Sequence, residues 1–293
     1  MVITLIEWKA GTGRFNAPEF YHWRVAHSSS FDTVRELSLG GGYNASYHHL
    51  YGRSQTKGPI TGEPQMEKTR AEMKLVSVNT GLPREVMWHG RSVTTGIFKQ
   101  PVQGRVALRK LNLDGDGQAD LTVHGGEYKA VYCYPIAHYG YWRRELPGRE
   151  VPIAIFGENF TTDGLLEDSI HLGDQFSIGS AKVIVTQPRL PCYKLGVRFQ
   201  ADDMVKRFLA SGRTGFYFAV TREGEVGADD EIKLIARDPN GVPVSEITRL
   251  YIAKRYADDD VTWVRRALRV AALPESWKEY FRERLQRMGI AAG

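Results

Sequence analysis

Apolar and polar residues begin to alternate near Met73, in the order that a half-buried strand requires. The run 73–79 (MKLVSVN) is the first case, and further β-prone runs follow at 102–113, 130–134, 170–178, 182–186, 215–221 and 232–236. Glycine and aspartate turn signals separate these runs, as at Asp114-Gly115 and Asp163-Gly164. Many short strands, with only two helical stretches among them (136–146 and 202–211), predict a β-barrel rather than a doubly wound sheet.

The spacing of apolar residues becomes helical after about residue 244. Three stretches, 245–255, 259–271 and 274–288, are each typical of a short helix, and Val261, Val264 and Leu268 share one face of the second. We therefore predict a mainly β fold: a barrel domain over 73–240, with its core at 98–237, followed by a small three-helix domain over 244–290.

In residues 1–72, neither the alternation typical of a strand nor the apolar spacing typical of a helix continues for more than a few positions. They contain the runs 28–30 (SSS) and 40–42 (GGG), which favour loops or weak order. One hypothesis is that this extension comes from a start codon assigned too far upstream, with Met73 as the natural start. Mass spectrometry of the natural N-terminus tests it, and a peptide from residues 1–30 would contradict it.

Composition narrows the class of protein. The chain has 293 residues and two cysteines, which disfavours a disulfide framework and favours a reducing cytoplasm. The apolar runs are all shorter than the roughly 20 residues that span a bilayer. The net charge of +5 is spread among interspersed acids and bases, so nucleic-acid binding is disfavoured.

The densest chemical motif is the segment 187–195 (QPRLPCYKL), which surrounds Cys192. Pro188 and Pro191 stiffen the approach to the cysteine, while Arg189 and Lys194 bring positive charge close to its thiol. Nearby cations favour the thiolate, the form that attacks electrophiles and binds metals, although a buried inert cysteine is the alternative. Cys133, in an apolar strand without adjacent cations, is interpreted as structural.

Other motifs are weaker. His124-Gly125-Gly126 follows a strand-like run, and His124 either binds a ligand or simply occupies a turn. The segment 114–120 (DGDGQAD) lacks the sixth-position glycine and twelfth-position glutamate of a calcium loop, so we interpret it as a polar turn. In the loop 156–162 (FGENFTT), Glu158 and Asn159 either cap local backbone or face a ligand.

Taken together, these motifs resemble the MOSC domain, the C-terminal module of molybdenum cofactor sulfurases, and within it the YiiM-like proteins. The resemblance covers about 73–290 and depends on an ordered set of segments: 73–81, 95–102, 115–120, 124–126, 156–162, 172–174 and 188–194. It implies a barrel that binds a molybdopterin-type molybdenum cofactor. Pyridoxal phosphate belongs to a domain of larger relatives and is not expected here.

The resemblance also implies roles for particular residues. Cys192 matches the cysteine proposed as the thiolate ligand of molybdenum, and is thus the catalytic and metal-binding candidate. Lys99, His124, Asn159 and Arg189 fall on positions expected to line the cofactor pocket, and Lys194 adds a cation. Some relatives carry a further cysteine where this chain has Tyr132; Cys133, one place along, should face the other side of its strand.

Three functions follow as hypotheses. The first is a molybdenum-dependent oxidoreductase that detoxifies N-hydroxylated compounds such as hydroxylaminopurine-type base analogues, with electrons from an external donor protein. The second is a sulfur carrier that delivers a Cys192 persulfide for metal–sulfur cofactor assembly. The third is a basic binding module, whose affinity for nucleic acid would fall steeply with salt. The oligomeric state stays open, with a homodimer as one candidate.

Overall fold

A computed structural model describes residues 72–120 and 125–291, so most of the predicted extension 1–72 lies outside the described residues. The strands are β1 (Met73–Thr80), β2 (Arg84–Trp88), β3 (Arg91–Thr95), β4 (Gln100–Pro101), β5 (Arg105–Leu108), β6 (Val131–Pro135), β7 (Phe160–Asp163), β8 (Gln175–Ile178), β9 (Ala181–Pro188), β10 (Phe216–Arg222), β11 (Gly224–Gly227) and β12 (Glu231–Ala236). The helices are η1 (Glu127–Lys129), α1 (Ala137–Glu145), α2 (Tyr193–Phe199), α3 (Met204–Ala210), α4 (Val244–Ile252), α5 (Asp258–Arg269) and α6 (Glu275–Arg287).

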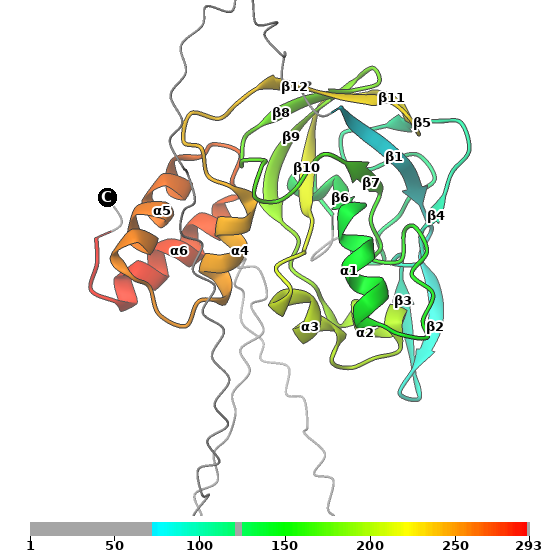
Figure 1. Cartoon of the computed structure of the whole chain (residues 1–293), viewed down its shortest axis with the longest axis horizontal. Coiled ribbons are helices and arrows are strands. Elements are labelled where there is room, and N and C mark those ends of the chain that lie inside the picture. Colours follow the sequence, from blue (N-terminus) through cyan, green and yellow to red (C-terminus); the bar gives the residue numbers. More distant parts are fainter. Residues whose placement is uncertain (1–71, 121–124, 292–293) are drawn as a thin grey trace, which may run out of the picture. The chain divides into compact units, whose positions relative to one another are not determined.

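Seven strands form a closed barrel in the order β12-β8-β9-β10-β6-β7-β1 (Figure 1). The first and last of them pair with each other, with Met73 opposite Ile232, and this pairing closes the ring. All neighbours are antiparallel except β6 and β7, which run parallel. The predicted mainly β barrel followed by three helices is therefore confirmed.

One hydrophobic core fills the barrel and continues into the C-terminal helices. Strand β9 shows how the sequence produces it, since Val183 and Val185 are buried while Ile184 between them is less so. Helix α4 contacts β9, and the helical side of the core contains Val264, Trp277 and Phe281. The three-helix domain thus covers part of the barrel wall (Figure 1).

A second, aromatic-rich cluster lies between β6 and the helices α1 and α3. Strand β6 contributes to both clusters because successive side chains point to opposite faces. Tyr132 and Tyr134 belong to the aromatic cluster, whereas Cys133 belongs to the barrel core. The prediction that Cys133 faces away from the Tyr132 side is therefore confirmed.

Several predicted elements differ in extent or number. The run 102–113 contains only the strand β5, because Arg109 N–H donates to the Asn112 carbonyl at 2.8 Å and closes a turn. A third helix, α2, follows Cys192 directly, and the hairpin β2–β3 was not anticipated. Residues 170–174 precede β8 as a turn fixed by Asp174, whose carboxylate accepts the His171 N–H at 3.0 Å.

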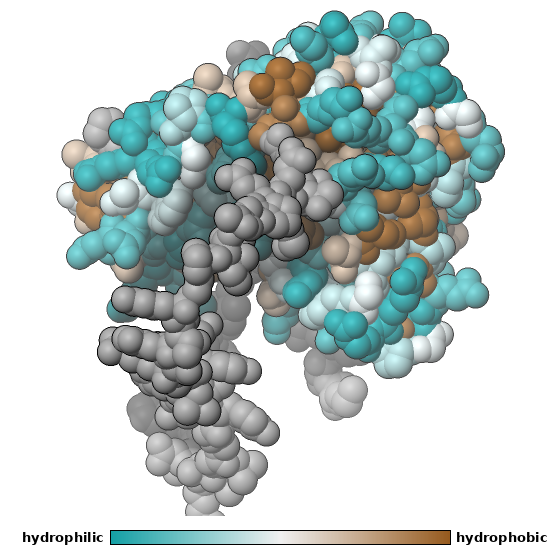
Figure 2. Space-filling model, turned by 45° about the horizontal axis from the view of Figure 1, so that its top comes forward, coloured by the Kyte–Doolittle hydropathy of each residue, from teal (hydrophilic) through white to brown (hydrophobic). Residues whose placement is uncertain are grey.

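The molecular surface is predominantly hydrophilic on the face shown in Figure 2, with apolar side chains gathered in small groups. Exposed large apolar residues include Leu82 and Met87, beside and within the hairpin. Within residues 72–120 and 125–291, each helix is too short or too polar to cross a bilayer. The cytoplasmic location stays a prediction.

Candidate functional site

A pocket opens beside the barrel and encloses about 670 Å³ of space that no protein atom occupies, part of it open to solvent. Five predicted residues, Lys99, Asn159, Arg189, Cys192 and Lys194, all line it. The sixth, His124, lies outside the described residues. The other lining residues are Thr95, Gly96, Ile97, Gly117, Gln118, Ala119, Gly125, Lys129, Tyr132, Phe156, Gly157, Leu190 and Tyr217.

Cys192 is placed at the pocket by the end of β9 and the start of α2. Its backbone is extended (φ −116°, ψ 174°), and its carbonyl accepts the Leu195 N–H at 2.9 Å as the helix begins. The residue is partly buried, so its thiol can meet a molecule that enters the pocket. This differs sharply from Cys133, which is fully buried and lies 3.3 Å from the Thr162 hydroxyl. Burial raises the pKa of the Cys133 thiol and keeps it protonated.

One wall of the pocket is built on a buried ion pair between Lys99 and Asp116. The other carboxylate oxygen of Asp116 accepts the Asn159 amide at 2.8 Å, and the first also accepts the Gly81 N–H at 3.0 Å. Burial lowers the pKa of Lys99, and Asp116 opposes that change. The charge of Lys99 is therefore already compensated within the protein. The segment 114–120 does form a turn at Asp114-Gly115, as predicted, and the structure adds a buried role for Asp116 that the sequence did not indicate.

Asn159 also holds this wall together. Besides Asp116, its amide nitrogen donates to the Asn79 carbonyl at 3.3 Å, and its oxygen accepts the Tyr132 N–H at 3.1 Å. Gly157, two residues earlier, has a positive φ of 79°, and a Cβ there would lie 2.7 Å from an Ile97 side-chain carbon. Only glycine fits this close approach.

Glu158 lies behind the loop as a fully buried carboxylate. It accepts hydrogen bonds from the Ala154 and Phe156 N–H groups and the Thr161 hydroxyl, all at 3.1 Å, and from the Tyr139 hydroxyl. Burial raises the pKa of Glu158, and these donors oppose that shift. The loop is therefore held in two ways, by the hydrogen bonds of Glu158 and by those of Asn159.

Arg189 also lines the pocket and is only 6% exposed. Its guanidinium lies over the Tyr132 ring, 5.0 Å from the centroid, and 5.1 Å from that of Phe208. Its Nη1 is buried and has no hydrogen-bond partner among the described residues, where Arg189 also forms no ion pair with a carboxylate. A buried cation in this state is costly unless an anion joins it. The pocket is therefore chemically suited to an anionic ligand.

Two lysines increase the positive charge near Cys192. Lys194 is partly buried in α2, and Lys129 ends the short helix η1, which follows Gly125-Gly126. Burial lowers the pKa of Lys129, while the neighbouring Cys192 opposes that change. Lys129 was not predicted, and the signal that could have revealed it is its place five residues after His124.

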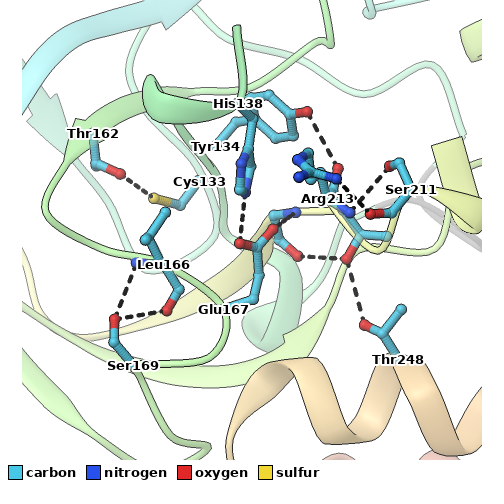
Figure 3. A network of polar contacts seen from close by, with 12 residues as sticks. Cys133, Tyr134, His138, Thr162, Leu166, Glu167, Ser169, Ser211, Arg213 and Thr248 are labelled. Carbon is cyan, nitrogen blue, oxygen red and sulfur yellow. Dashed lines mark hydrogen bonds and ion pairs between the residues drawn. The ribbon is translucent and has the colours of Figure 1, made fainter. Parts of the chain in front are cut away.

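A buried polar network supports the pocket from the side of the three-helix domain (Figure 3). Glu167 lies at its centre: one oxygen is 2.7 Å from His138 Nε2, and the other accepts the Gly215 N–H at 2.7 Å. The Gly215 carbonyl in turn accepts the Arg189 N–H at 3.1 Å. The network thus fixes the backbone of Arg189, which lines the pocket.

The same network reaches the C-terminal helices and the aromatic wall. The Thr214 hydroxyl lies 3.4 Å from that of Thr248 in α4, and the Thr214 carbonyl accepts the Tyr132 hydroxyl at 3.0 Å. Tyr134 donates to the Arg213 carbonyl at 3.2 Å (Figure 3). Both Tyr132 and Arg189 are therefore held by contacts outside the pocket.

The arrangement combines one accessible thiol, several aromatic rings and four cations, of which Lys99 is already paired with Asp116. Within the described part of the chain, His, Cys, Asp and Glu side chains do not form a group of three that could hold a metal ion. The described lining of the pocket offers one thiol as a soft ligand, that of Cys192, with anion-binding groups around it. Such a pocket suits an anionic organic molecule, alone or with a metal that brings its own other ligands.

Comparison with known proteins identifies two family models in the chain. Residues 120–233 match the MOSC domain, and residues 242–287 match the YiiM-like 3-alpha helix domain. A Bacillus subtilis protein described as uncharacterized YflK is 40% identical over 73% of this chain and 95% of its own length. Protein YiiM of Escherichia coli is 36% identical over 71% of this chain and 91% of its own length.

Solved structures agree with these matches. YiiM from Geobacillus stearothermophilus superimposes with a TM-score of 0.60 at 35% identity, over 73% of this chain and 99% of that one. YiiM from Escherichia coli gives a TM-score of 0.58 at 31% identity, over 74% and 94%. A further relative, described as a reductase of Gibberella moniliformis, is 32% identical over 50% of this chain but only 27% of its own length. The chain therefore belongs to the MOSC domain family, among its YiiM-like members.

Proposed function

We propose that the pocket binds a molybdenum cofactor and that the protein reduces N-hydroxylated compounds. The observation that carries the proposal is the unpartnered, buried Nη1 of Arg189 in the same pocket as the accessible Cys192. Two further findings support it: membership of the MOSC family, and the similarity to a protein described as a reductase.

The pocket residues fit the parts of such a cofactor. Cys192 supplies a thiolate, a soft ligand suited to a metal that changes oxidation state. Arg189, Lys129 and Lys194 would hold the phosphate of the pterin, with Arg189 able to form paired hydrogen bonds. The rings of Tyr132, Phe156 and Tyr217 line the same space and would flank a planar ring system.

When bound, the cofactor would supply two-electron reduction of the N–O bond. The overall change adds two electrons and two protons to R–NHOH and yields R–NH₂ and water. Hydroxylaminopurine-type base analogues are the proposed substrates, and an external donor protein would provide the electrons. The chain itself would bind the cofactor, orient it between its fixed walls and exclude bulk water, while the redox chemistry belongs to the cofactor.

The test is to purify the protein from cells that synthesise molybdenum cofactor and to measure its molybdenum, pterin and reductase activity on hydroxylamine-type substrates. Near-stoichiometric metal that is lost in Cys192→Ala supports the proposal. Cys133→Ala is the matched control, because that cysteine lies in the barrel core, and it should retain the metal. A protein without metal that carries a persulfide on Cys192 would instead indicate a sulfur carrier, and the reductase proposal would be wrong.

A further inference from the structure

Helix α6 of the three-helix domain makes one buried hydrogen bond to β9, the strand that precedes Arg189. In α6, Trp277 is 4% exposed, and its Nε1 lies 2.7 Å from Oε1 of Gln187 in β9. Gln187 comes two residues before Arg189. An indole N–H can only donate, so this contact holds the amide oxygen of Gln187 toward Trp277 and turns its NH₂ group the other way.

The NH₂ group of Gln187 donates to the Tyr128 carbonyl at 3.2 Å. The Thr186 hydroxyl also reaches that carbonyl, at 2.7 Å, but it lies 3.1 Å from the Tyr217 carbonyl as well. One hydroxyl has one proton and cannot donate fully to both carbonyls. Gln187 is therefore the donor that keeps the Tyr128 peptide in place when Thr186 bonds to Tyr217.

The Tyr128 peptide leads directly into Lys129, whose ammonium group is a positive charge in the same pocket as Cys192. Tyr128 and Lys129 are consecutive residues of η1, a single short turn that is anchored where the Tyr128 carbonyl is held. Lys129 lines the pocket together with Cys192. A change in the orientation of Gln187 would release one side of this turn and move the ammonium group relative to the thiol.

We propose that Trp277, acting through Gln187, is a positioning residue for Lys129, so that the three-helix domain sets the positive charge beside Cys192. The inference goes beyond the proposed function, because it concerns the protein's own groups and holds for any anionic ligand. A failure of the reductase assay would leave it unaffected.

Two alkylating reagents of different charge test this directly. Iodoacetate and iodoacetamide both form an S–C bond with the thiolate and release iodide, but only iodoacetate is an anion. The ratio of their rates at Cys192, measured by peptide mass spectrometry, reports the local positive charge. General loosening of the fold would change both rates by a similar factor and leave the ratio unchanged.

Trp277→Phe removes the N–H donor and keeps an aromatic ring beside Tyr251 and Phe281. We expect the iodoacetate-to-iodoacetamide ratio to fall about two- to fivefold, as for displacement of one partly screened charge. The matched control is Trp263→Phe in α5, whose ring packs under the Arg266 guanidinium, and it should leave the ratio unchanged. Gln187→Met, which keeps Trp277 but removes the donor to Tyr128, should lower the ratio as Trp277→Phe does, and it serves if that variant folds poorly.

A double-mutant cycle tests whether Lys129 is the positive charge that Trp277 positions beside Cys192. Lys129→Gln alone should lower the ratio at least as much as Trp277→Phe, and the double variant should show no further fall. An unchanged ratio in both Trp277→Phe and Gln187→Met would overturn the proposal. So would a full additional fall when Trp277→Phe is added to Lys129→Gln.

Discussion

Two buried cations line the same pocket, and they differ in one respect. Lys99 has a carboxylate partner, Asp116, which is itself held by Asn159 and Gly81. Arg189 lies on aromatic rings, and one of its nitrogens is buried without a partner in the described structure. Both residues are 6% exposed, so burial does not distinguish them.

Because of this difference, the charge of Lys99 has a structural role, whereas the charge of Arg189 is available to a ligand. A buried ion pair contributes little net stability, but removal of one partner is costly because the other charge is left alone. An unpaired buried cation already carries that cost, which an incoming anion can offset. We therefore expect loss of a Lys99 contact to damage the fold, and loss of Arg189 to damage binding.

The largest effect is expected for Asp116→Asn. The change leaves Lys99 buried without its counter-charge and sets an amide NH₂ against the Asn159 NH₂, at a cost of roughly 3–5 kcal/mol. The melting temperature should fall by roughly 6–15 °C, measured by calorimetry. Asp114→Asn is the matched control, because Asp114 pairs with Arg109 at the exposed surface, and it should melt close to wild type. Equal melting of the two variants would contradict the structural role of Lys99.

The same variant should partly recover at high pH. Without Asp116, burial lowers the pKa of Lys99 further below its ordinary value of 10.5. Between those two pKa values the unfolded chain binds more protons than the folded one, so the stability of the variant rises with pH. The gap in melting temperature to wild type should therefore narrow from pH 7 to about pH 10. A gap that widens over this range would mean that Lys99 is not the source of the instability.

Arg189→Met, in contrast to Asp116→Asn, should reduce ligand binding and leave the stability of the fold almost unchanged. Methionine keeps an apolar stem against Tyr132 and Phe208 and removes the unpaired charge, so the melting temperature should change little. Retention of molybdenum and pterin after gel filtration should fall about tenfold or more, since a charged hydrogen bond contributes about 1.5–3 kcal/mol. Arg213→Met, which removes an arginine stacked on Tyr141 outside the pocket lining, is the control and should retain the cofactor. Destabilisation as large as that of Asp116→Asn would remove the distinction between the two cations.

Lys194→Gln is expected to give the smallest effect. Lys194 is only partly buried, and solvent and salt screen its charge. Cofactor retention should fall about two- to threefold at low salt, and the difference from wild type should shrink as salt is added. An effect as large as that of Arg189→Met would show that anion binding does not depend on the buried guanidinium.

The sequence predicted the parts of the molecule that depend on local patterns. Alternation along β9 and β10 and helical spacing in α5 and α6 were sufficient for the barrel and the three helices. Cys192 and its two cations were recognised because they lie within six residues of each other. Lys99 and Asn159 depended on the family resemblance, and the structure brings both to the same wall.

What the sequence did not reveal depends on contacts between distant segments. Asp116 lies in a glycine-rich turn, and its burial requires Gly81 and Asn159, which come from other parts of the chain. Helix α2 contains Gly196, a poor helix former, at a site where a Cβ would lie 3.0 Å from the Ala201 carbonyl. The hairpin β2–β3 includes Met87, which is 69% exposed. An apolar residue on the exposed face weakens the apolar–polar alternation by which a strand is recognised.

The pairing of β1 with β12 has a consequence for how the chain folds. These two strands are the first and last of the barrel, so the ring cannot close until nearly the whole domain has left the ribosome. Contacts between such distant segments slow folding, because the entropy of a long loop is lost before they form. During that interval the edges of β1 and β8, the two strands that pair with β12, stay open to other chains. Aggregation during synthesis, rather than unfolding of the finished barrel, is then the expected failure of variants that weaken β1.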